Sequence, residues 1–201
     1  GRVAMICAPA LGMLIALALE RLTSTRSLST QYFGLLSVCV ALLPLVPAPL
    51  KAVERPATPA FFTDGAWKPY VHKGESLVPL PLPDPGSAEA LHWQQRAGLG
   101  FKLPGGYFNG PWGKNRTGIY GAAPRYTSQM LRDVRYTGVI PEIGKNWRAQ
   151  ARRDFAYWRA GALVVAPQQN DDALRKAVTE LVGRDAKWVD GVWVWDLHTG
   201  G

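Results

Sequence analysis

The chain has 201 residues, and its 23 Lys and Arg residues outnumber 15 Asp and Glu residues, so its formal net charge is +8. This sign favours anionic partners, but the basic residues are scattered among acids and form no nucleic-acid-binding motif, so we expect no nucleic acid partner. The only cysteines, Cys7 and Cys39, lie in apolar stretches and indicate neither a disulfide framework nor a thiol site.

Two charge-free runs occupy the first quarter of the chain. No charged residue lies in the 17 positions between Arg2 and Glu20, or in the 24 positions between Arg26 and Lys51. A helix of about 20 residues, rising about 1.5 Å per residue, matches the roughly 30 Å hydrocarbon core of a bilayer. We therefore expect two transmembrane helices, at about residues 3–19 and 33–50, and a lipid bilayer as partner.

The connection between these runs carries Arg21 and Arg26. By the positive-inside rule it is cytoplasmic, which predicts a multi-pass protein of the plasma membrane with an extracytoplasmic C-terminal domain. The alternative for the first run is a signal peptide over residues 2–18, but it leaves the second run unexplained. Because the chain begins with Gly1 rather than Met, we expect a piece of a longer protein with further spans upstream.

Residues 51–75 combine proline and glycine with aromatic side chains, and we expect a juxtamembrane linker that leads into a domain. The aromatic residues are Phe61, Phe62, Trp67 and Tyr70. Aromatic residues just beyond a span commonly lie at the lipid headgroup level. They fit the beginning of a domain core equally well, and the sequence leaves both interpretations open.

Residues 76–201 alternate between strand and amphipathic helix patterns, which predicts an extracytoplasmic α/β layered domain. We expect strands at 76–80, 98–103 and 162–166, and helices at 87–96, from Ser128 onward, at 147–159 and at 171–182. The last helix is the clearest, because acids lie in its first turn and Gly183 follows its end. Asp190-Gly191 then predicts a Trp-rich β-hairpin between strands 187–189 and 192–196.

Familiar catalytic and metal-binding motifs are absent from the sequence. Leu103 stands where the dinucleotide fingerprint requires a glycine, and there is no P-loop or nucleophile elbow. His72, His92 and His198 have no ligand-like spacing, so we expect no metal site. No acid pairs convincingly with a second acid, so we assign no catalytic residue. The acids considered are Asp64, Glu75, Asp133, Asp154 and Asp190, each more typical of a cap, a turn or a salt bridge.

An aromatic and amide-rich set surrounds the glycine-rich segment 105–121. Sugars pack their apolar faces on aromatic rings and hydrogen-bond to side-chain amides, while glycine lets the backbone approach a ligand. The candidate substrate-binding residues are Trp93, Gln94, Tyr107, Asn109, Trp112 and Tyr120. The alternative is that these aromatic residues belong to a core and that the segment is only a loop.

A family resemblance that covers nearly the whole chain is carried by five sequence blocks: FFTDGAWKPYV, LHWQQRAGLGFKLPGGYFNGPWG, PRYTSQML, DFAYWRAGALVVAP and DGVWVWDL. Behind two apolar runs, this order resembles the C-terminal region of actinobacterial multi-spanning membrane proteins of the GT-C glycosyltransferase type. The resemblance implies a transferase of the cell envelope that uses a polyprenyl-phosphate-linked sugar donor. It also implies that the catalytic acid lies upstream of this chain, and we expect no cofactor within it.

The expected function is therefore that of the C-terminal, non-catalytic portion of an integral membrane glycosyltransferase. Its C-terminal domain would help to position an acceptor glycan. The alternative is a non-catalytic, membrane-tethered module for carbohydrate binding or cell-envelope assembly. A glycan or a lipid-linked sugar is the expected ligand.

Overall fold

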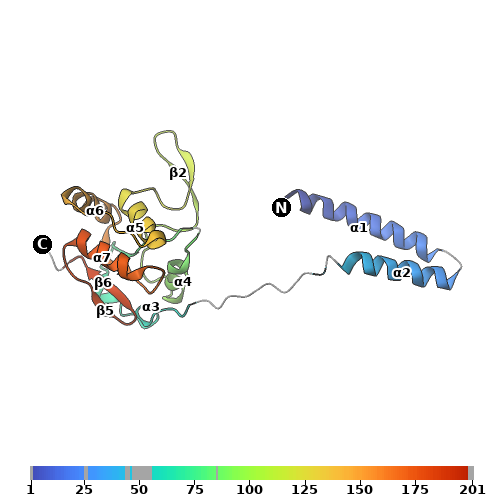
Figure 1. The fold of residues 1–201 in the computed structure, drawn as a ribbon, viewed down its shortest axis with the longest axis horizontal. Coiled ribbons are helices and arrows are strands. Elements are labelled where there is room, and N and C mark those ends of the chain that lie inside the picture. Colours follow the sequence, from blue (N-terminus) through green and yellow to red (C-terminus); the bar gives the residue numbers. More distant parts are fainter. Residues whose placement is uncertain (1, 25–26, 44–45, 47–55, 85, 199–201) are drawn as a thin grey trace. The chain divides into compact units, whose positions relative to one another are not determined.

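The computed structural model describes residues 2–24, 27–43, 46, 56–84 and 86–198. The chain divides into two compact units, Gly1–Arg55 and Pro56–Gly201 (Figure 1).

The first unit is a pair of helices, α1 (Arg2–Thr23) and α2 (Leu28–Leu42), that lie side by side in opposite directions (Figure 1). The Gln31 side-chain amide donates a hydrogen bond to the Thr23 carbonyl oxygen at 3.0 Å, which ties the start of α2 to the end of α1. A Cβ atom at Gly34 would lie 2.7 Å from a methyl carbon of Leu22. The glycine therefore permits the close approach of the two helices.

The prediction of transmembrane helices at residues 3–19 and 33–50 was wrong. Within the part of the chain that the structure describes, no helix is long and apolar enough to cross a membrane. Helix α2 has 15 residues, about 22 Å at about 1.5 Å per residue, against a hydrocarbon core of roughly 30 Å. The 17 charge-free positions that precede Glu20 in α1 cover only about 26 Å on the same scale.

The error came from counting charge-free positions as continuous helix. Helix α2 ends at Leu42, and residues 44–45 and 47–50 of the second predicted span lie outside the described residues. The expected location as a multi-pass protein of the plasma membrane, with its extracytoplasmic domain, depended on these spans and is corrected with them.

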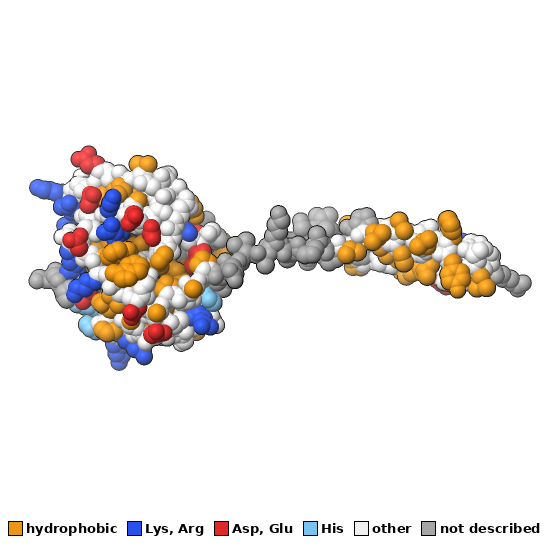
Figure 2. All heavy atoms as spheres, turned by 60° about the horizontal axis from the view of Figure 1, so that its bottom comes forward, with side chains coloured by type: hydrophobic (Ala, Val, Ile, Leu, Met, Phe, Trp, Pro, Cys, Tyr) orange, Lys and Arg blue, Asp and Glu red, His pale blue; other side chains and the backbone are white. Residues whose placement is uncertain are grey.

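The first unit leaves most of its described apolar side chains exposed to solvent. Among its described residues, Leu14 is 64% exposed and Phe33 is 76% exposed, and α2 buries no residue. Apolar side chains accordingly spread over the face of this unit that is visible in Figure 2. Contact between α1 and α2 alone thus buries little apolar surface.

The second unit contains a four-stranded mixed sheet in the order β1–β4–β6–β5. Its strands are β1 (Ser76–Pro79), β4 (Ala160–Val165), β5 (Lys187–Val189) and β6 (Val192–Asp196). Strand β4 runs parallel to β1 and antiparallel to β6, and β5 and β6 form the hairpin that turns at Asp190-Gly191. Strand β4 is buried from Gly161 to Val165, as expected for a strand covered on both faces.

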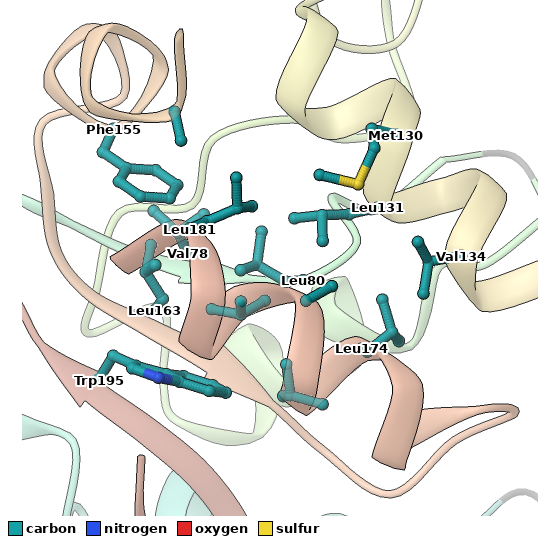
Figure 3. Close-up of a cluster of buried hydrophobic side chains, with 14 of the residues drawn as sticks. Val78, Leu80, Met130, Leu131, Val134, Phe155, Leu163, Leu174, Leu181 and Trp195 are labelled. Carbon is teal, nitrogen blue, oxygen red and sulfur yellow. The ribbon is translucent and has the colours of Figure 1, made fainter. Parts of the chain in front are cut away.

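Three helices cover one face of this sheet: α5 (Tyr126–Thr137), α6 (Lys145–Tyr157) and α7 (Asp171–Val182). Figure 3 shows Leu131 of α5, Phe155 of α6 and Leu181 of α7 converging with strand residues on a single apolar cluster. The strand residues in this cluster are Val78, Leu163, Val165 and Trp195, all at most 1% exposed.

An aromatic layer covers the other face, formed by the short helix α3 (Ala60–Thr63), helix α4 (Glu89–Arg96) and the segments beside them. Phe61 and Phe62 are 0% and 1% exposed and pack with Trp67 and Phe101 against Leu77, Ala162, Val164, Val192 and Val194. The sequence left open whether these aromatic residues lie at the lipid headgroup level or begin a domain core, and they belong to the core.

A separate two-stranded sheet, β2 (Asn109–Trp112) with β3 (Thr117–Tyr120), projects from this unit as a hairpin (Figure 1). The strand predicted at 98–103 is absent from the described residues except for one bridge between Lys102 and Ser76. Gly98 and Leu99 both have positive φ angles, so the backbone turns there instead of extending.

One buried carboxylate joins α5 to α6. The Asp154 side chain is 0% exposed and accepts hydrogen bonds from Arg125 Nε at 2.8 Å, Gln150 Nε2 at 2.8 Å and the Thr127 backbone N–H at 3.1 Å. Thr127 is the second residue of α5, where backbone N–H groups have no acceptor within the helix. Burial by itself would raise the pKa of Asp154, but hydrogen bonds from Thr127, Arg125 and Gln150 hold that pKa below its ordinary value.

We expect Asp154→Asn to lower the free energy of unfolding by about 3 kcal/mol at pH 7, because it removes the buried partner of Arg125. The lowered pKa means that this stabilisation is present above the ordinary value of 3.8 and is lost as the pH falls through the folded-state pKa. Urea denaturation at pH 7 and at decreasing pH measures both effects. The control is Asp133→Asn, at an exposed position of α5. Equal stability of wild type and Asp154→Asn at pH 7 would contradict this assignment.

Candidate metal centre

Three polar side chains meet at one edge of the four-stranded sheet. His72 and Glu75 lie just before β1, and His198 lies two residues after the end of β6. Because β1 is parallel and β6 antiparallel to β4, the start of β1 and the end of β6 lie at the same edge, on either side of the start of β4. The sheet topology therefore brings together residues that are 123 positions apart.

The Glu75 carboxylate lies beside both imidazole rings, within 4 Å of a nitrogen of each. His198 Nε2 is 2.8 Å from Glu75 Oε2 and 3.0 Å from Oε1, and His72 Nδ1 is 3.7 Å from Oε2. The His72 backbone N–H also donates to Oε2 at 2.8 Å, and the ring centroids of the two histidines are 4.1 Å apart. One donor atom from each of the three residues lies within 4.8 Å of the other two.

Asp196 orients the His198 ring from behind. Its Oδ1 atom is 2.9 Å from His198 Nδ1 and accepts the His198 backbone N–H at 3.0 Å. With Nδ1 engaged in this way, Nε2 is the ring nitrogen directed toward Glu75. A carboxylate behind a histidine is the usual arrangement that fixes the orientation and tautomer of a metal ligand.

The same contacts shift the pKa values of the pair. Partial burial would lower the pKa of His198, but hydrogen bonds with Glu75 and Asp196 raise it above its ordinary value. Partial burial would raise the pKa of Glu75, but the His72 backbone N–H and the His198 ring lower it below its ordinary value. The carboxylate is therefore ionised at neutral pH, the state that a metal ligand requires, whereas a metal ion must displace the proton that these contacts favour on His198.

Gly161, the second residue of β4, makes room for this arrangement. A Cβ atom at this position would lie 2.6 Å from Glu75 Oε2 and 2.7 Å from the carbonyl oxygen of Tyr70. The carbonyl oxygen of Gly161 also accepts the Leu197 backbone N–H at 2.9 Å, next to His198. The start of β4 therefore positions both the carboxylate and the histidine after β6.

Two imidazole nitrogens and one carboxylate form a donor set that suits Zn²⁺, and catalytic zinc sites use such a set with a fourth position open. Donor atoms that share a tetrahedral zinc ion lie about 3.3 Å apart, since each is about 2.0–2.1 Å from the metal. The separations of 2.8 and 3.7 Å from Glu75 lie on either side of this spacing. The His72 side chain is 65% exposed, so the cluster is open to solvent.

The sequence interpretation, which expected no metal site, did not find this cluster. His92 lies on α4 and is not part of it, whereas His72 and His198 are brought together. Two local signals were present, His-x-x-Glu at 72–75 and Asp-x-His at 196–198. Neither is specific alone, because each supplies only part of a ligand set.

The structure divides the six candidate substrate-binding residues into two groups. Trp93 and Gln94 lie on α4 and take part in packing. Trp93 stacks on Phe62 with ring centroids 4.8 Å apart, and Gln94 Nε2 donates to the Phe101 carbonyl oxygen at 2.7 Å. The other four lie on or beside the β2–β3 hairpin: Tyr107, Asn109, Trp112 and Tyr120.

The hairpin separates its own aromatic side chains. Tyr120 is paired with Asn109, and Trp112 is paired with Thr117. Because side chains alternate along a strand and paired residues share a face, Trp112 lies on the opposite face from Asn109 and Tyr120. Tyr107 packs edge-on against Tyr120 with centroids 5.0 Å apart. Local desolvation and the neighbouring Tyr107 phenol raise the pKa of Tyr120 to about 12.

We expect Gly161→Ala to displace Glu75 from His198 and to lower the free energy of unfolding by about 1–3 kcal/mol, because the added methyl group overpacks this edge. The measurement is chemical denaturation together with the NMR shift of the His198 ring. The control is Gly118→Ala in β3, where a Cβ atom meets nothing within 4 Å. An unchanged His198 signal in Gly161→Ala would contradict the role given to this glycine.

No protein-family model matches this chain, and neither a curated protein nor a solved structure matches it. The resemblance to GT-C glycosyltransferases thus stays a prediction.

Proposed function

We propose that this protein binds a divalent transition-metal ion, Zn²⁺ foremost, through His72, Glu75 and His198. The observation that carries the proposal is the meeting of three donor atoms within 4.8 Å of one another. They come from segments at opposite ends of the second unit's sequence, with Asp196 hydrogen-bonded behind His198.

The chemistry of the donor set favours zinc over the alkaline-earth ions. Imidazole nitrogen suits Zn²⁺ and its transition-metal neighbours, whereas Ca²⁺ and Mg²⁺ prefer six or more oxygen ligands. The cluster supplies two nitrogens and one carboxylate. Three protein ligands leave a coordination position for water or for a ligand.

A bound zinc ion would act as a Lewis acid and lower the pKa of a coordinated water molecule. The protein residues have separate tasks. Glu75 supplies negative charge, Asp196 fixes the His198 ring, and Gly161 leaves space for the carboxylate. The ion would also link the segment before β1 to the segment after β6, so that binding stabilises the fold.

We expect the full chain to bind one Zn²⁺ ion, measured by isothermal titration calorimetry on metal-free protein and by the rise in the thermal unfolding midpoint. His198→Ala should weaken zinc binding about 100-fold or more, because it removes a ligand. Asp196→Asn should weaken it about 10-fold, the usual effect of losing the hydrogen bond behind a histidine ligand.

His92→Ala is the matched control, since it removes a histidine that lies on α4 outside the cluster. It should leave zinc affinity unchanged. Tight zinc binding that survives in both His198→Ala and His72→Ala would assign the ion to another place and reject the proposal.

A second function, glycan contact at the β2–β3 hairpin, is favoured by the exposure of its aromatic side chains. Tyr107, Trp112 and Tyr120 are 61%, 39% and 48% exposed on an element that projects from the unit. Exposed aromatic faces of this kind are available for stacking on sugars. The polyprenyl-phosphate-linked donor implied by the family resemblance stays a prediction without a described residue to support it.

We expect Trp112→Ala to weaken binding of a soluble envelope oligosaccharide, measured by NMR titration of the full chain. The loss should be at least 10-fold in affinity, because one stacking surface is removed. Trp188→Ala is the control, since Trp188 is 53% exposed but lies on β5, away from the hairpin. Equal losses in both variants, or no binding by wild type, would reject glycan contact at the hairpin.

A further inference from the structure

A hollow of about 440 Å³ opens directly beside the metal-binding cluster. Glu75 belongs to both, and the hollow is lined by Lys73 and Leu197, the chain neighbours of His72 and His198. The two segments that supply the metal ligands therefore also supply the wall of the hollow. A ligand in the hollow would lie against the carboxylate that holds the ion.

The charged residues of the hollow favour an anion. Lys73 and Arg159 line it, and no described residue forms an ion pair with either of them. Glu75 is the acid among the described lining residues, and its charge is already engaged by His198. Together with a bound divalent ion, these two side chains would create a local field that attracts negative ligands.

The position of Arg159 is held by the backbone on both sides. Arg159 follows α6 and precedes β4, and its φ angle of 50° lies in the left-handed region that glycine adopts most easily. Its carbonyl oxygen accepts the Ser76 backbone N–H at 2.8 Å, which ties the turn to the start of β1. This turn fixes the backbone from which the exposed Arg159 side chain lines the hollow.

The remaining wall of the hollow is mainly apolar. Phe155 and Leu197 line the hollow together with two alanines, Ala156 and Ala160. An apolar body of about the size of an aromatic ring would bury against these side chains. An inorganic anion would leave this surface unused.

We propose that the hollow binds a phosphomonoester with a small apolar body. This proposal rests on the proposed function, because the metal ion is one of three cations that would contact the phosphoryl group. Lys73 and Arg159 supply the other two, and a planar guanidinium group matches two phosphoryl oxygens at once. A phosphomonoester offers three non-bridging oxygens, each able to accept more than one contact, so that all three cations can be engaged, whereas a carboxylate offers only two oxygens.

The test titrates phenyl phosphate into the full chain loaded with Zn²⁺ and follows binding by calorimetry and ³¹P NMR. Wild type should bind phenyl phosphate at least 10-fold more tightly than it binds inorganic phosphate or benzoate. Arg159→Gln and Lys73→Gln should each weaken this binding about 10-fold. Arg148→Gln, at an exposed position of α6 outside the hollow, should not change it.

Each variant is first titrated with Zn²⁺ alone, and Arg159→Gln and Lys73→Gln should keep wild-type zinc affinity within 2-fold. If the chain binds zinc, but Arg159→Gln does not weaken its binding of phenyl phosphate or wild type binds none, this inference is overturned and the proposed function remains intact. Binding of phenyl phosphate that depends on Arg159, in a protein that binds no zinc, would overturn the proposed function and the role of the ion here. Equal affinity for phenyl phosphate and inorganic phosphate would reject the apolar part of the site.

Discussion

The burial of β4 on both faces is the constraint on which the second unit depends. Leu163 and Val165 face the cluster formed with α5, α6 and α7, while Ala162 and Val164 face the aromatic layer. A strand enclosed in this way has no room for polar side chains along its length. Polar side chains of this sheet therefore lie toward the ends of its strands. At the start of β4, Gly161 leaves space for one of them, Glu75.

Two carboxylates on this unit show how burial separates structural from functional roles. Asp154 is fully buried and is surrounded by donors from Arg125, Gln150 and Thr127, because a buried charge without partners is strongly destabilising. The side chain of Glu75 is 28% exposed, and its partners, the His72 and His198 side chains, are 65% and 27% exposed. The first carboxylate joins two helices, whereas the second is accessible to a ligand. The metal and phosphate proposals both depend on this accessibility.

The two apolar runs at the start of the chain illustrate a different limit. Their lack of charge was real, but the distance spanned depends on where each helix begins and ends, and α2 stops at Leu42. Hydropathy along the sequence does not show such an end when no charged residue marks it. The opposite case is α7, where Asn170 and Gly183 both adopt left-handed conformations at the helix boundaries. Local chemistry at the ends, more than apolar content, made that helix predictable.

The sequence by itself determined the elements whose signals are local. The helix predicted at 171–182 lies at Asp171–Val182, and the Asp190-Gly191 turn joins β5 to β6, because caps and tight turns depend on a few adjacent residues. Only the tertiary structure decided that Phe61 and Phe62 are core residues and that Asp154 joins two helices. It also decided that Trp112 and Tyr120 lie on opposite faces of the hairpin. It alone brought Glu75 to His198 across 123 positions. The physical reason is that strand pairing sets such contacts, and pairing depends on the packing of the whole sheet rather than on spacing along the chain.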